Sequence, residues 1–495
     1  MLEIIRSPQL SRHDLILLEQ TVIEKARADS DIFAQYVFEY RNQPFHTMWH
    51  RFIDTHQYGA ILSYRGSGKS EQITIPRSCW EIGRNPDIRI KIATESDDLA
   101  SKILSKISQT LLENDRYHRV FPQVKKARNL PWTRKALYIE RKKHLKDPTI
   151  EATGILTART GGRMDLALFD DACGLRNSLL FPKMREVVKE AFFSNWLNMR
   201  DDPATFRWYV IGTPWHISDL VSDMRTNPGI PKCQETKVGP DFESPWPERH
   251  SSDYFREQMR IMGRRHFNRA YRLVALDDSE AWLNPDALLA ARDFSLKAGD
   301  LIVNPDITKF TGVDLGHRSG EEHSPSVIFT VGYLPDKRRV PLDIRISHDA
   351  SPLSIIKVLI NEQKLCNSTL TMVENVGAQS YIVDLANQLG PGDHKIEGFF
   401  TSASSKFDIY TGVPGLFAEM ENSKWVIPLG TGGTHDEACL CHMCRWMSEL
   451  RDFPNGKIDT VMASWLAWQA LRKMKERAHA SGGFSIWEWG SVGEG

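Results

Sequence analysis

Residues Ser63–Ser70 read Ser-Tyr-Arg-Gly-Ser-Gly-Lys-Ser, and this stretch decides the expected fold. Its two glycines allow a tight turn whose backbone N–H groups face an anion. Lys69 is placed to reach the β- and γ-phosphates of a nucleotide, and the Ser70 hydroxyl is placed to bind Mg²⁺. The helix expected after the turn adds its positive N-terminal end. The pattern therefore predicts a phosphate-binding loop made of Arg65, Gly66, Ser67, Gly68, Lys69 and Ser70.

The residues around this loop leave two interpretations open. The apolar run at 60–62 is the expected end of a buried strand, which favours a phosphate loop. The usual pattern begins with Gly five positions before the last Gly, and Ser63 stands there instead. The alternative is a Gly-rich turn that carries an exposed lysine.

The composition is that of an ordinary globular protein. The chain has 495 residues, 41% of them hydrophobic and 25% charged, which is enough for two or three domains. Its 63 basic and 63 acidic residues balance, so binding to nucleic acid would require local patches. No apolar run approaches the length of a membrane-spanning helix, and the N-terminus lacks the features of a signal peptide. The seven cysteines are scattered, which fits a reducing compartment.

Helices and strands are expected to alternate in the first half. Residues 10–42, 70–83 and 97–115 have helical periodicity, and residues 88–93 alternate as a strand. This order favours a doubly wound, mostly parallel sheet. Residues 119–146 carry ten Lys or Arg against one Glu. A DNA-facing patch and a solvated hairpin explain this basic stretch equally well.

A second apolar strand ends in two acids, in the sequence Leu-Ala-Leu-Phe-Asp-Asp at 166–171. Doubly wound sheets bind their ligands at the carboxyl ends of the strands. Asp170 is expected to hold Mg²⁺ through water, and Asp171 to orient or deprotonate an attacking water. Downstream of a phosphate loop this pattern indicates nucleotide hydrolysis, and two capping acids in a loop are the structural alternative.

Four further residues are candidates for the same site. Arg159 and Arg163, in a Gly-containing loop, are candidates to bring positive charge to the γ-phosphate, in cis or as an arginine finger into a neighbouring subunit; surface ion pairs are the alternative. Thr213, in Ile-Gly-Thr-Pro, follows a strand and is either a γ-phosphate sensor or part of an ordinary turn. Gln43 is a candidate to read an adenine edge, or is a turn residue before proline.

Three acids on separate elements stand out in the second half. Asp314 lies within an expected strand, Glu374 ends another, and Asp459 opens a long apolar helix. Carboxylates at a sheet edge can hold two divalent ions about 3.5–4 Å apart, which stabilise the attacking and leaving oxygens of a phosphodiester. Oxygen ligands favour Mg²⁺ or Mn²⁺. A mid-strand acid costs free energy unless it is paired or metal-bound, so Asp314 is the strongest candidate, whereas Asp459 alone fits a helix N-cap.

Five residues between 435 and 444 have the composition of a zinc site. A zinc site usually offers two ligand pairs separated by a loop, but these residues all fall in ten positions of an expected helix. At helical spacing only His435, Cys439 and His442 share a face. We therefore expect Cys439, Cys441 and Cys444 to be buried cysteines on a core helix rather than zinc ligands.

Taken together, the motifs resemble those of the large subunit of the tailed-phage terminase, an ATP-driven DNA-packaging motor. The resemblance rests on Arg-Gly-Ser-Gly-Lys-Ser at 65–70, on the run from Thr153 into Leu-Phe-Asp-Asp, and on Ile-Gly-Thr-Pro. It implies that Lys69 and Ser70 bind ATP, that Asp170 positions Mg²⁺ and that Thr213 belongs to a coupling motif. The family commonly has Glu where Asp171 stands here.

The second half resembles the RNase H-like nuclease domain of the same family, whose acidic positions fall on Asp314, Glu374 and Asp459. The family often has a further Asp just after the third acid, where this chain has Met462 and Ala463. Glu321 or Glu322 is a candidate for a replacement ligand.

The resemblance implies an α/β architecture: a P-loop (ASCE-type) doubly wound ATPase domain followed by an RNase H-like nuclease domain. The expected segments are an N-terminal helical segment at 1–42, the ATPase domain at 43–275, a linker at 276–305, the nuclease domain at 306–475 and a flexible tail at 476–495.

The function that the resemblance implies is DNA packaging. ATP hydrolysis would drive double-stranded viral DNA into the procapsid, and a nuclease with Mg²⁺ or Mn²⁺ would cut the concatemer. The implied partners are DNA, the portal protein, the small terminase subunit and further copies in a ring, with no membrane, in the cytoplasm of an infected bacterium. The alternatives are a helicase- or repair-type ATPase-nuclease and a non-catalytic DNA-binding assembly factor.

Overall fold

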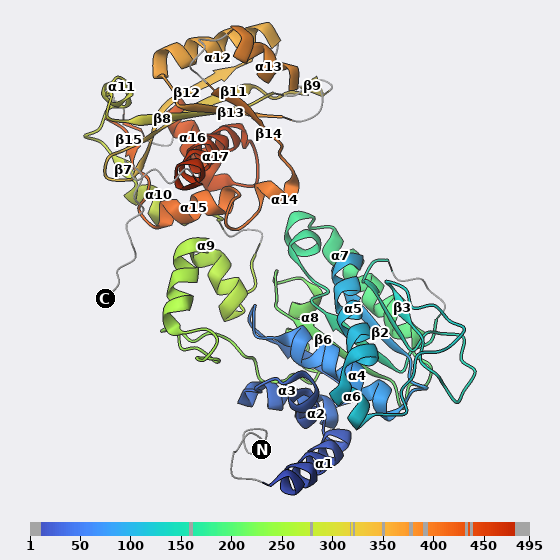
Figure 1. Ribbon diagram of the computed structural model, residues 1–495. Coiled ribbons are helices and arrows are strands. Elements are labelled where there is room, and N and C mark those ends of the chain that lie inside the picture. The colour runs from blue at the N-terminus through green and yellow to red at the C-terminus, as the bar shows by residue number, and fades with distance from the viewer. Residues whose placement is uncertain are drawn as a thin grey trace. The chain divides into compact units, whose positions relative to one another are not determined.

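The computed structural model divides into two compact units, each described by itself below (Figure 1). Unit 1 comprises Met1–Arg256 and Phe267–Asp278, and unit 2 comprises Glu257–His266 and Ser279–Gly495. The described residues are 11–157, 162–277, 281–316, 318–319, 322–348, 352–375, 380–389, 395–430, 434–435 and 439–480.

Unit 1 is built on a six-stranded sheet with the order β1-β6-β5-β2-β4-β3. All neighbouring strands are parallel except β3, which is antiparallel to β4. In this order β6 separates the strand before the phosphate loop, β1, from the acid-bearing β5, as in the ASCE type of P-loop fold. The strands are β1 (Tyr58–Leu62), β2 (Ile90–Thr94), β3 (Ala136–Leu137), β4 (Ile150–Gly154), β5 (Leu166–Asp170) and β6 (Arg207–Gly212).

Alternating residues of these strands enter two separate cores, so the sheet is covered on both faces. Leu166 and Leu168 pack in the core that contains the N-terminal helices, whereas Ala167 and Phe169 pack with Trp196 in the core on the other face. The helices that carry residues of unit 1 are α1 (Arg12–Ala28), α2 (Ser30–Phe38), α3 (Pro44–Thr55), α4 (Ile75–Arg84), α5 (Asp97–Glu113), α6 (Asp115–Val120), α7 (Met184–Glu190), α8 (Leu220–Thr226) and α9 (Ser252–Arg272), the last of which also contributes to unit 2.

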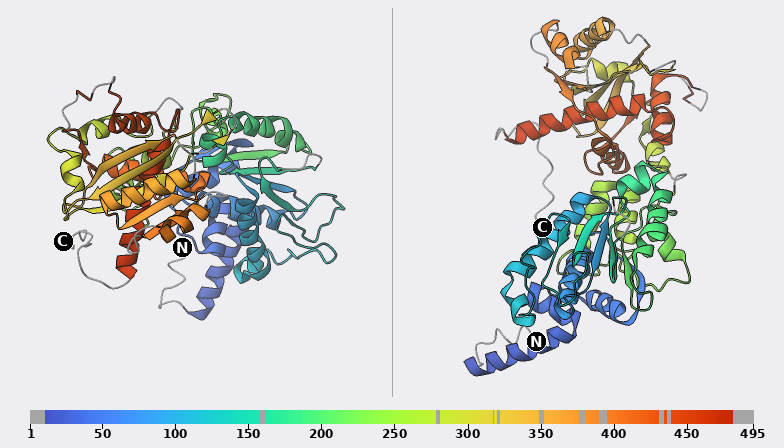
Figure 2. Two further views of the ribbon diagram at one scale, coloured as in Figure 1. Left: turned by 90° about the horizontal axis from the view of Figure 1, so that it is seen from above. Right: turned by 90° about the vertical axis from the view of Figure 1, so that its right-hand side faces the viewer.

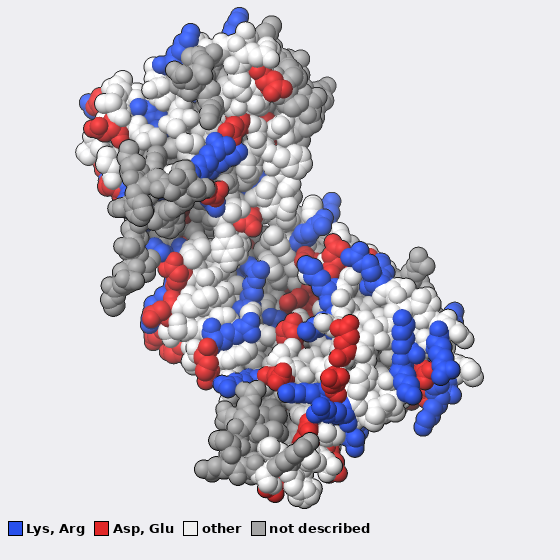
Figure 3. Space-filling view, in the orientation of Figure 1, with Lys and Arg blue, Asp and Glu red and all other residues white. Residues whose placement is uncertain are grey.

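The predicted helices at 10–42 form α1 and α2, and they do not stand apart from the sheet. Val22, Ala26 and Phe33 are buried in the same core as the strands of unit 1. The basic stretch at 119–146 runs from the end of α6 through β3, and Figure 3 shows Lys and Arg gathered on the side of unit 1 that carries β3. Part of this charge is structural, because Arg141 donates to the carbonyl oxygens of Pro86, Ile88 and Asp147.

Unit 2 is built on a five-stranded sheet with the order β12-β11-β8-β13-β14. β11 is antiparallel to both neighbours, whereas β13 is parallel to β8 and β14. This is the strand order and direction of an RNase H-like sheet. The strands of unit 2 are β7 (Arg292–Asp293), β8 (Thr308–Asp314), β9 (Arg318–Ser319), β10 (Glu322–His323), β11 (Ser326–Tyr333), β12 (Arg339–Ser347), β13 (Leu370–Glu374), β14 (Lys395–Phe399) and β15 (Ile427–Pro428).

Helices cover both faces of this second sheet. Phe310 and Met372 pack with residues of α16 and α17 in one core, whereas Val313 and Val373 pack with residues of α12 and α13 in the other. The right-hand view in Figure 2 shows α17, in red, as the long helix beside the strands. The helices are α10 (Pro285–Ala290), α11 (Ala298–Ile302), α12 (Pro352–Cys366), α13 (Ser380–Leu389), α14 (Ala403–Lys406), α15 (Val413–Glu421), α16 (His442–Asp452) and α17 (Asp459–Ala480).

The ends of unit 2 differ from the sequence expectation. Residues 276–305, expected to be a linker, include α10, β7 and α11, and the side chains of Leu283 and Leu288 are buried in the core of unit 2. Prolines and acids suggested a linker, but the apolar residues between them supply core contacts. At the other end α17 continues to Ala480, past the expected start of the tail at 476; residues 481–495 lie outside the described residues. No described helix is long and apolar enough to cross a membrane.

A close approach of backbones at Gly312 fixes α17 against β8. A Cβ atom on Gly312 would lie 2.1 Å from both the Ala463 carbonyl oxygen and the Ala467 nitrogen. These are backbone atoms of α17, so a side chain at this position cannot be accommodated by rotating a neighbour.

Gly312→Ala is therefore expected to lower the free energy of unfolding of unit 2 by about 1–3 kcal/mol or more, by overpacking. The matched control is Gly299→Ala in α11, where a Cβ meets nothing within 4 Å and alanine favours the helix. Urea unfolding followed by tryptophan fluorescence measures both. Equal stability of the two variants would contradict this account of the β8–α17 contact.

Candidate functional sites

The loop at Ser63–Ser70, which the sequence predicts to bind phosphate, lies at the carboxyl end of β1. Gly66 and Gly68 have φ values of +89° and +86°, a left-handed conformation that glycine adopts without a steric penalty. After Lys69 the chain makes one wide helical turn over Ser70–Thr74 and continues as α4. Arg65 is exposed, and its backbone N–H donates to the carbonyl oxygen of Ala270 at 2.8 Å.

Lys69 and Thr213 are brought together at the edge of the sheet. The Lys69 ammonium is buried and donates to the carbonyl oxygens of Ser63 and Tyr64 at 3.2 Å and to the Thr213 hydroxyl at 3.1 Å. Thr213 in turn donates to the Ser63 carbonyl oxygen at 2.8 Å. The lysine is thus held inside its own loop by the threonine that follows β6.

Asp170 ends β5 with an unsatisfied buried carboxylate. Its exposed fraction is 1%, and neither oxygen has a hydrogen-bond partner among the described residues. Burial, with a smaller contribution from the charge of Asp171, raises the pKa of Asp170 to about 7, against the opposing effects of Ser70, Thr74 and Lys69. A buried carboxylate without a hydrogen-bond donor, next to the Ser70 hydroxyl, offers the oxygen ligands that Mg²⁺ prefers.

Asp171 has a backbone conformation that few residues adopt. Its φ is +43°, in the left-handed region, which aspartate tolerates better than most residues. Its N–H donates to the Ile211 carbonyl oxygen at 2.9 Å, and a Cβ on Gly212 would lie 3.6 Å from its Oδ1 atom. Asp171 therefore stands between the ends of β5 and β6, next to Asp170.

Glu95 is a second carboxylate near this edge that the sequence analysis missed. It follows β2 directly, and its Oε1 atom accepts the Arg176 N–H at 3.0 Å. Burial raises the pKa of Glu95, with a small contribution from Asp171, while the N–H groups of Arg176 and Asn177 oppose the rise. The only signal for Glu95 in the sequence is that it directly follows an expected strand. That this strand lies next to β5 becomes known only from the order of strands in the sheet.

Gln43 is linked to the phosphate loop through a histidine that the sequence analysis also missed. The Gln43 N–H donates to Nδ1 of His46 at 3.0 Å, so Nε2 carries the proton that is shared with the Ser67 carbonyl oxygen at 2.9 Å. His46 is fully buried, and burial lowers its pKa to about 4. Trp246 packs edge-on against the ring, with the centroids 4.9 Å apart.

Of the two arginine candidates the structure describes only Arg163, which does not lie at the loop. Arg163 is exposed and donates to the Arg200 carbonyl oxygen at 3.3 Å. It precedes the first residue of β5, at the opposite end of that strand from Asp170, because the strand runs away from it toward the phosphate loop. Arg159 lies outside the described residues.

In unit 2 the three predicted acids converge on one edge. β8 ends at Asp314 instead of continuing past it as expected, and β13 ends at Glu374 beside it. Burial, then a side-chain hydrogen bond with Glu374 and its charge, raise the pKa of Asp314 well above its usual value; Asp459 adds to this and Lys406 opposes it. Asp459 is the first residue of α17, and burial followed by the charge of Glu449 raises its pKa.

The surroundings of Glu374 add two polar residues that the sequence analysis did not name. The Thr401 hydroxyl donates to Oε1 of Glu374, and the Lys406 ammonium lies 3.7 Å from the same oxygen. Lys406 lies near Glu374 and Asp314, whereas the basic groups that act on Asp459 are Arg445 and Lys457. Neighbouring carboxylates that repel one another are a set of oxygen donors that suits a divalent cation.

Two positions where the nuclease resemblance would lead one to expect an acid are buried in the core of unit 2 instead. Met462 and Ala463, which stand where a further acid is common, are buried hydrophobic residues of the unit 2 core. Glu321 and the side chain of Glu322 lie outside the described residues.

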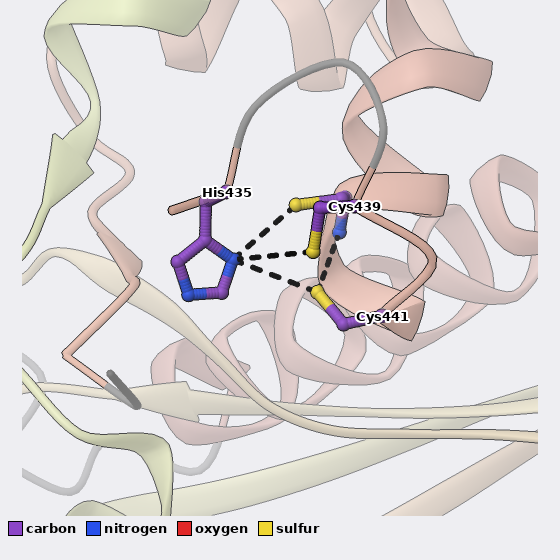
Figure 4. Close-up of side chains that lie close together, drawn as sticks. His435, Cys439 and Cys441 are labelled. Atoms are coloured by element: carbon purple, nitrogen blue, oxygen red, sulfur yellow. Dashed lines mark hydrogen bonds between the residues drawn. The ribbon is translucent and has the colours of Figure 1, made fainter. Parts of the chain in front are cut away.

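The expected core helix through residues 435–444 is wrong. α16 begins only at His442, and Cys441 is its N-cap with extended backbone angles. The His442 ring donates from Nδ1 to the Ile344 carbonyl oxygen at 2.6 Å, so it does not share a cluster with His435. Cys439, Cys441 and Cys444 are partly exposed and gather around His435 (Figure 4). The sequence prediction missed this cluster because it treated residues 435–444 as one continuous helix.

Comparisons with known proteins place large terminases among the similar structures. No family model and no curated protein matches the chain. A large terminase from a thermophilic bacteriophage is 11% identical, with 90% of this chain and 99% of that chain covered and a TM-score of 0.46. The bacteriophage HK97 large terminase is 10% identical, with 90% and 98% covered and a TM-score of 0.35. The large terminase nuclease of thermophilic phage G20c with bound magnesium is 15% identical, with 34% and 82% covered and a TM-score of 0.26.

The buried neutral state of His46 predicts a pH-dependent stability. In the unfolded chain a histidine has a pKa of about 6.5, so between about pH 7 and pH 4 the unfolded state binds more protons than the folded state. Stability therefore falls as the pH falls through this range. Between pH 7 and pH 5 the free energy of unfolding, measured with urea, is expected to fall in both proteins. The fall is expected to be about 1–2 kcal/mol smaller in His46→Gln than in the parent. The control is His13→Gln on the exposed side of α1; identical pH profiles for His46→Gln and the parent would contradict the assignment.

The geometry therefore gives two candidate sites, one around the Lys69 loop on the sheet of unit 1 and one formed by carboxylates on the sheet of unit 2. Large terminases are among the solved structures to which this chain is similar.

Proposed function

We propose that this chain is a terminase large subunit, an ATPase that moves double-stranded DNA into a procapsid and a metal-dependent endonuclease that cuts it. The observation that carries the proposal is the presence of both sites in one chain. Lys69, Asp170 and Thr213 surround a phosphate loop in unit 1, and Asp314, Glu374 and Asp459 converge in unit 2.

In unit 1 the roles follow from charge and position. The backbone of Gly66–Ser70 and the Lys69 ammonium bind the ATP phosphates, and Ser70 and Asp170 hold Mg²⁺, which when bound neutralises charge on the phosphates. Asp171, at the end of β5, orients the attacking water and accepts its proton.

Two residues connect the loop to its surroundings. Thr213 holds the Lys69 ammonium, so a lysine drawn toward a phosphate releases Thr213, and β6 responds to the nucleotide state. Gln43, next to the loop through His46, contacts the base.

In unit 2 the acids supply a site for Mg²⁺ or Mn²⁺, ions that polarise a phosphodiester and activate water when bound. The Thr401 hydroxyl fixes the direction of Oε1 of Glu374, and the Glu374 side chain also forms a hydrogen bond with Asp314. Asp459 approaches from the first turn of α17. Lys406 is placed to bind the DNA backbone phosphate beside these acids.

The proposed assembly is a ring of copies of this chain on the portal protein, working with the small terminase subunit inside the infected bacterium. In such a ring Arg159 or Arg163 would act on the nucleotide of a neighbouring subunit. The position of Arg163 at the far end of β5 from Asp170 supports action in trans rather than in cis.

Lys69→Ala is expected to lower kcat of ATP hydrolysis by at least about 100-fold, because the loop loses the buried ammonium that is placed to bind the phosphates. Metal-dependent cutting of plasmid DNA is expected to remain. The control is Lys102→Ala, an exposed lysine on α5. An unchanged ATPase rate in Lys69→Ala would reject the nucleotide site, and no affinity for ATP with Mg²⁺ in the parent would favour an assembly factor.

Asp314→Ala is expected to have the reverse effect. Cutting of plasmid DNA with Mn²⁺ or Mg²⁺ should fall by at least about 100-fold, because the metal loses a central ligand, while ATP hydrolysis continues. Asp306→Ala, an exposed acid before the same strand, is the control. Cutting that survives in Asp314→Ala would remove the nuclease assignment, and unwinding of a forked duplex by the parent would favour the helicase-type alternative.

A further inference from the structure

Four side chains of unit 2 meet away from the three acids. His435, Cys439, Cys441 and Cys444 offer one ligand atom each, and these four atoms all lie within 4.8 Å of one another. The Nδ1 atom of His435 is 3.3 Å from the sulfur of Cys444, 3.6 Å from that of Cys441 and 3.8 Å from that of Cys439. Figure 4 shows the histidine ring turned toward the three sulfurs.

These distances match the edges of a tetrahedral metal site. With Zn–S bonds of about 2.3 Å and a Zn–N bond of about 2.0 Å, a tetrahedral zinc ion separates its nitrogen and sulfur ligands by about 3.5 Å. The three nitrogen–sulfur distances lie between 3.3 and 3.8 Å. Three thiolates and one imidazole are a soft donor set that selects zinc over the oxygen-seeking Mg²⁺ or Mn²⁺.

The backbone directs these side chains inward. His435 has a φ of +47°, a left-handed conformation that turns the chain sharply before Cys439. Cys441 caps α16, and its sulfur accepts the Cys444 N–H at 3.4 Å. This hydrogen bond fixes the Cys441 sulfur at the N-terminus of α16, beside the sulfur of Cys444. The residues also fall into two pairs with spacings common in zinc sites, His435-x₃-Cys439 and Cys441-x₂-Cys444.

The cluster has a route to solvent. A cavity is lined by His435, Cys439 and Cys444 together with Leu283, Leu288 and Arg292. An ion can therefore reach the sulfurs without unfolding of unit 2, and with four protein ligands no position remains for a substrate.

We propose that His435, Cys439, Cys441 and Cys444 bind one structural zinc ion in unit 2. The site differs from the carboxylate site in its donor atoms and is independent of the proposed packaging function. Its effect is to fix the N-terminus of α16 to the segment that follows β15. From there α16 reaches the carboxylate site, because Glu449 accepts the backbone N–H of Thr460 at 2.8 Å, next to Asp459.

The test is metal analysis of the full-length chain, purified under reducing conditions with zinc and then dialysed against excess Mg²⁺. About one zinc per chain is expected, and replacement by Co²⁺ is expected to give a sulfur-to-cobalt charge-transfer band in the near ultraviolet. Cys441→Ser and Cys444→Ser should each lose the zinc and the band, and their unit 2 should unfold at a lower temperature.

Two controls separate this site from other zinc binding. Cys233→Ser changes a buried cysteine of unit 1, and Asp314→Ala changes the carboxylate site; both should keep the zinc. The proposal is overturned if the parent holds no zinc and its cobalt form lacks the band. It is also overturned if Asp314→Ala removes the zinc while Cys444→Ser keeps it, or if thiol titration finds a disulfide among Cys439, Cys441 and Cys444.

Discussion

Both units must compensate the free-energy cost of carboxylates that are buried at the ends of strands. Asp170 is almost without solvent contact and has no hydrogen-bond donor among the described residues, and the pKa of Asp314 is raised mainly by burial. A buried carboxylate destabilises a fold unless a cation or a proton compensates it. In unit 1 the compensating groups nearby are Lys69 and the hydroxyl of Ser70, and in unit 2 Lys406. These neighbouring groups offset part of the cost of burying each acid.

The sequence predicted the parts of this arrangement that depend on local order along the chain. The phosphate loop, the strand that ends in Asp170 and the three acids of unit 2 were all visible as short apolar runs followed by polar residues. His46 and Glu95 were not, because each reaches its site through a contact between elements far apart in the sequence or through the order of strands in the sheet. Side chains that act through tertiary contacts leave no periodic signal.

The expectation that the structure contradicts has a physical reason as well. One helix was expected through residues 435–444, but α16 begins only at His442, because a cysteine at the N-cap is not a recognised start signal. Arg163 shows a related limit of sequence proximity. It precedes the acid-bearing strand, but β5 itself separates it from Asp170, so the two residues lie at opposite ends of that strand.

The strained conformation of Asp171 bears on the chemistry at the end of β5. An aspartate at φ +43° is held there by its neighbours, since its N–H donates to β6 and its carbonyl oxygen accepts the Glu95 N–H at 3.2 Å. Residues held in sparsely populated conformations cluster at functional sites. Glu95 reaches the same edge from β2 with one methylene more than Asp171, and its side chain is fixed by the N–H of Arg176. The edge beside Asp170 therefore carries two further carboxylates of different reach, Asp171 and Glu95.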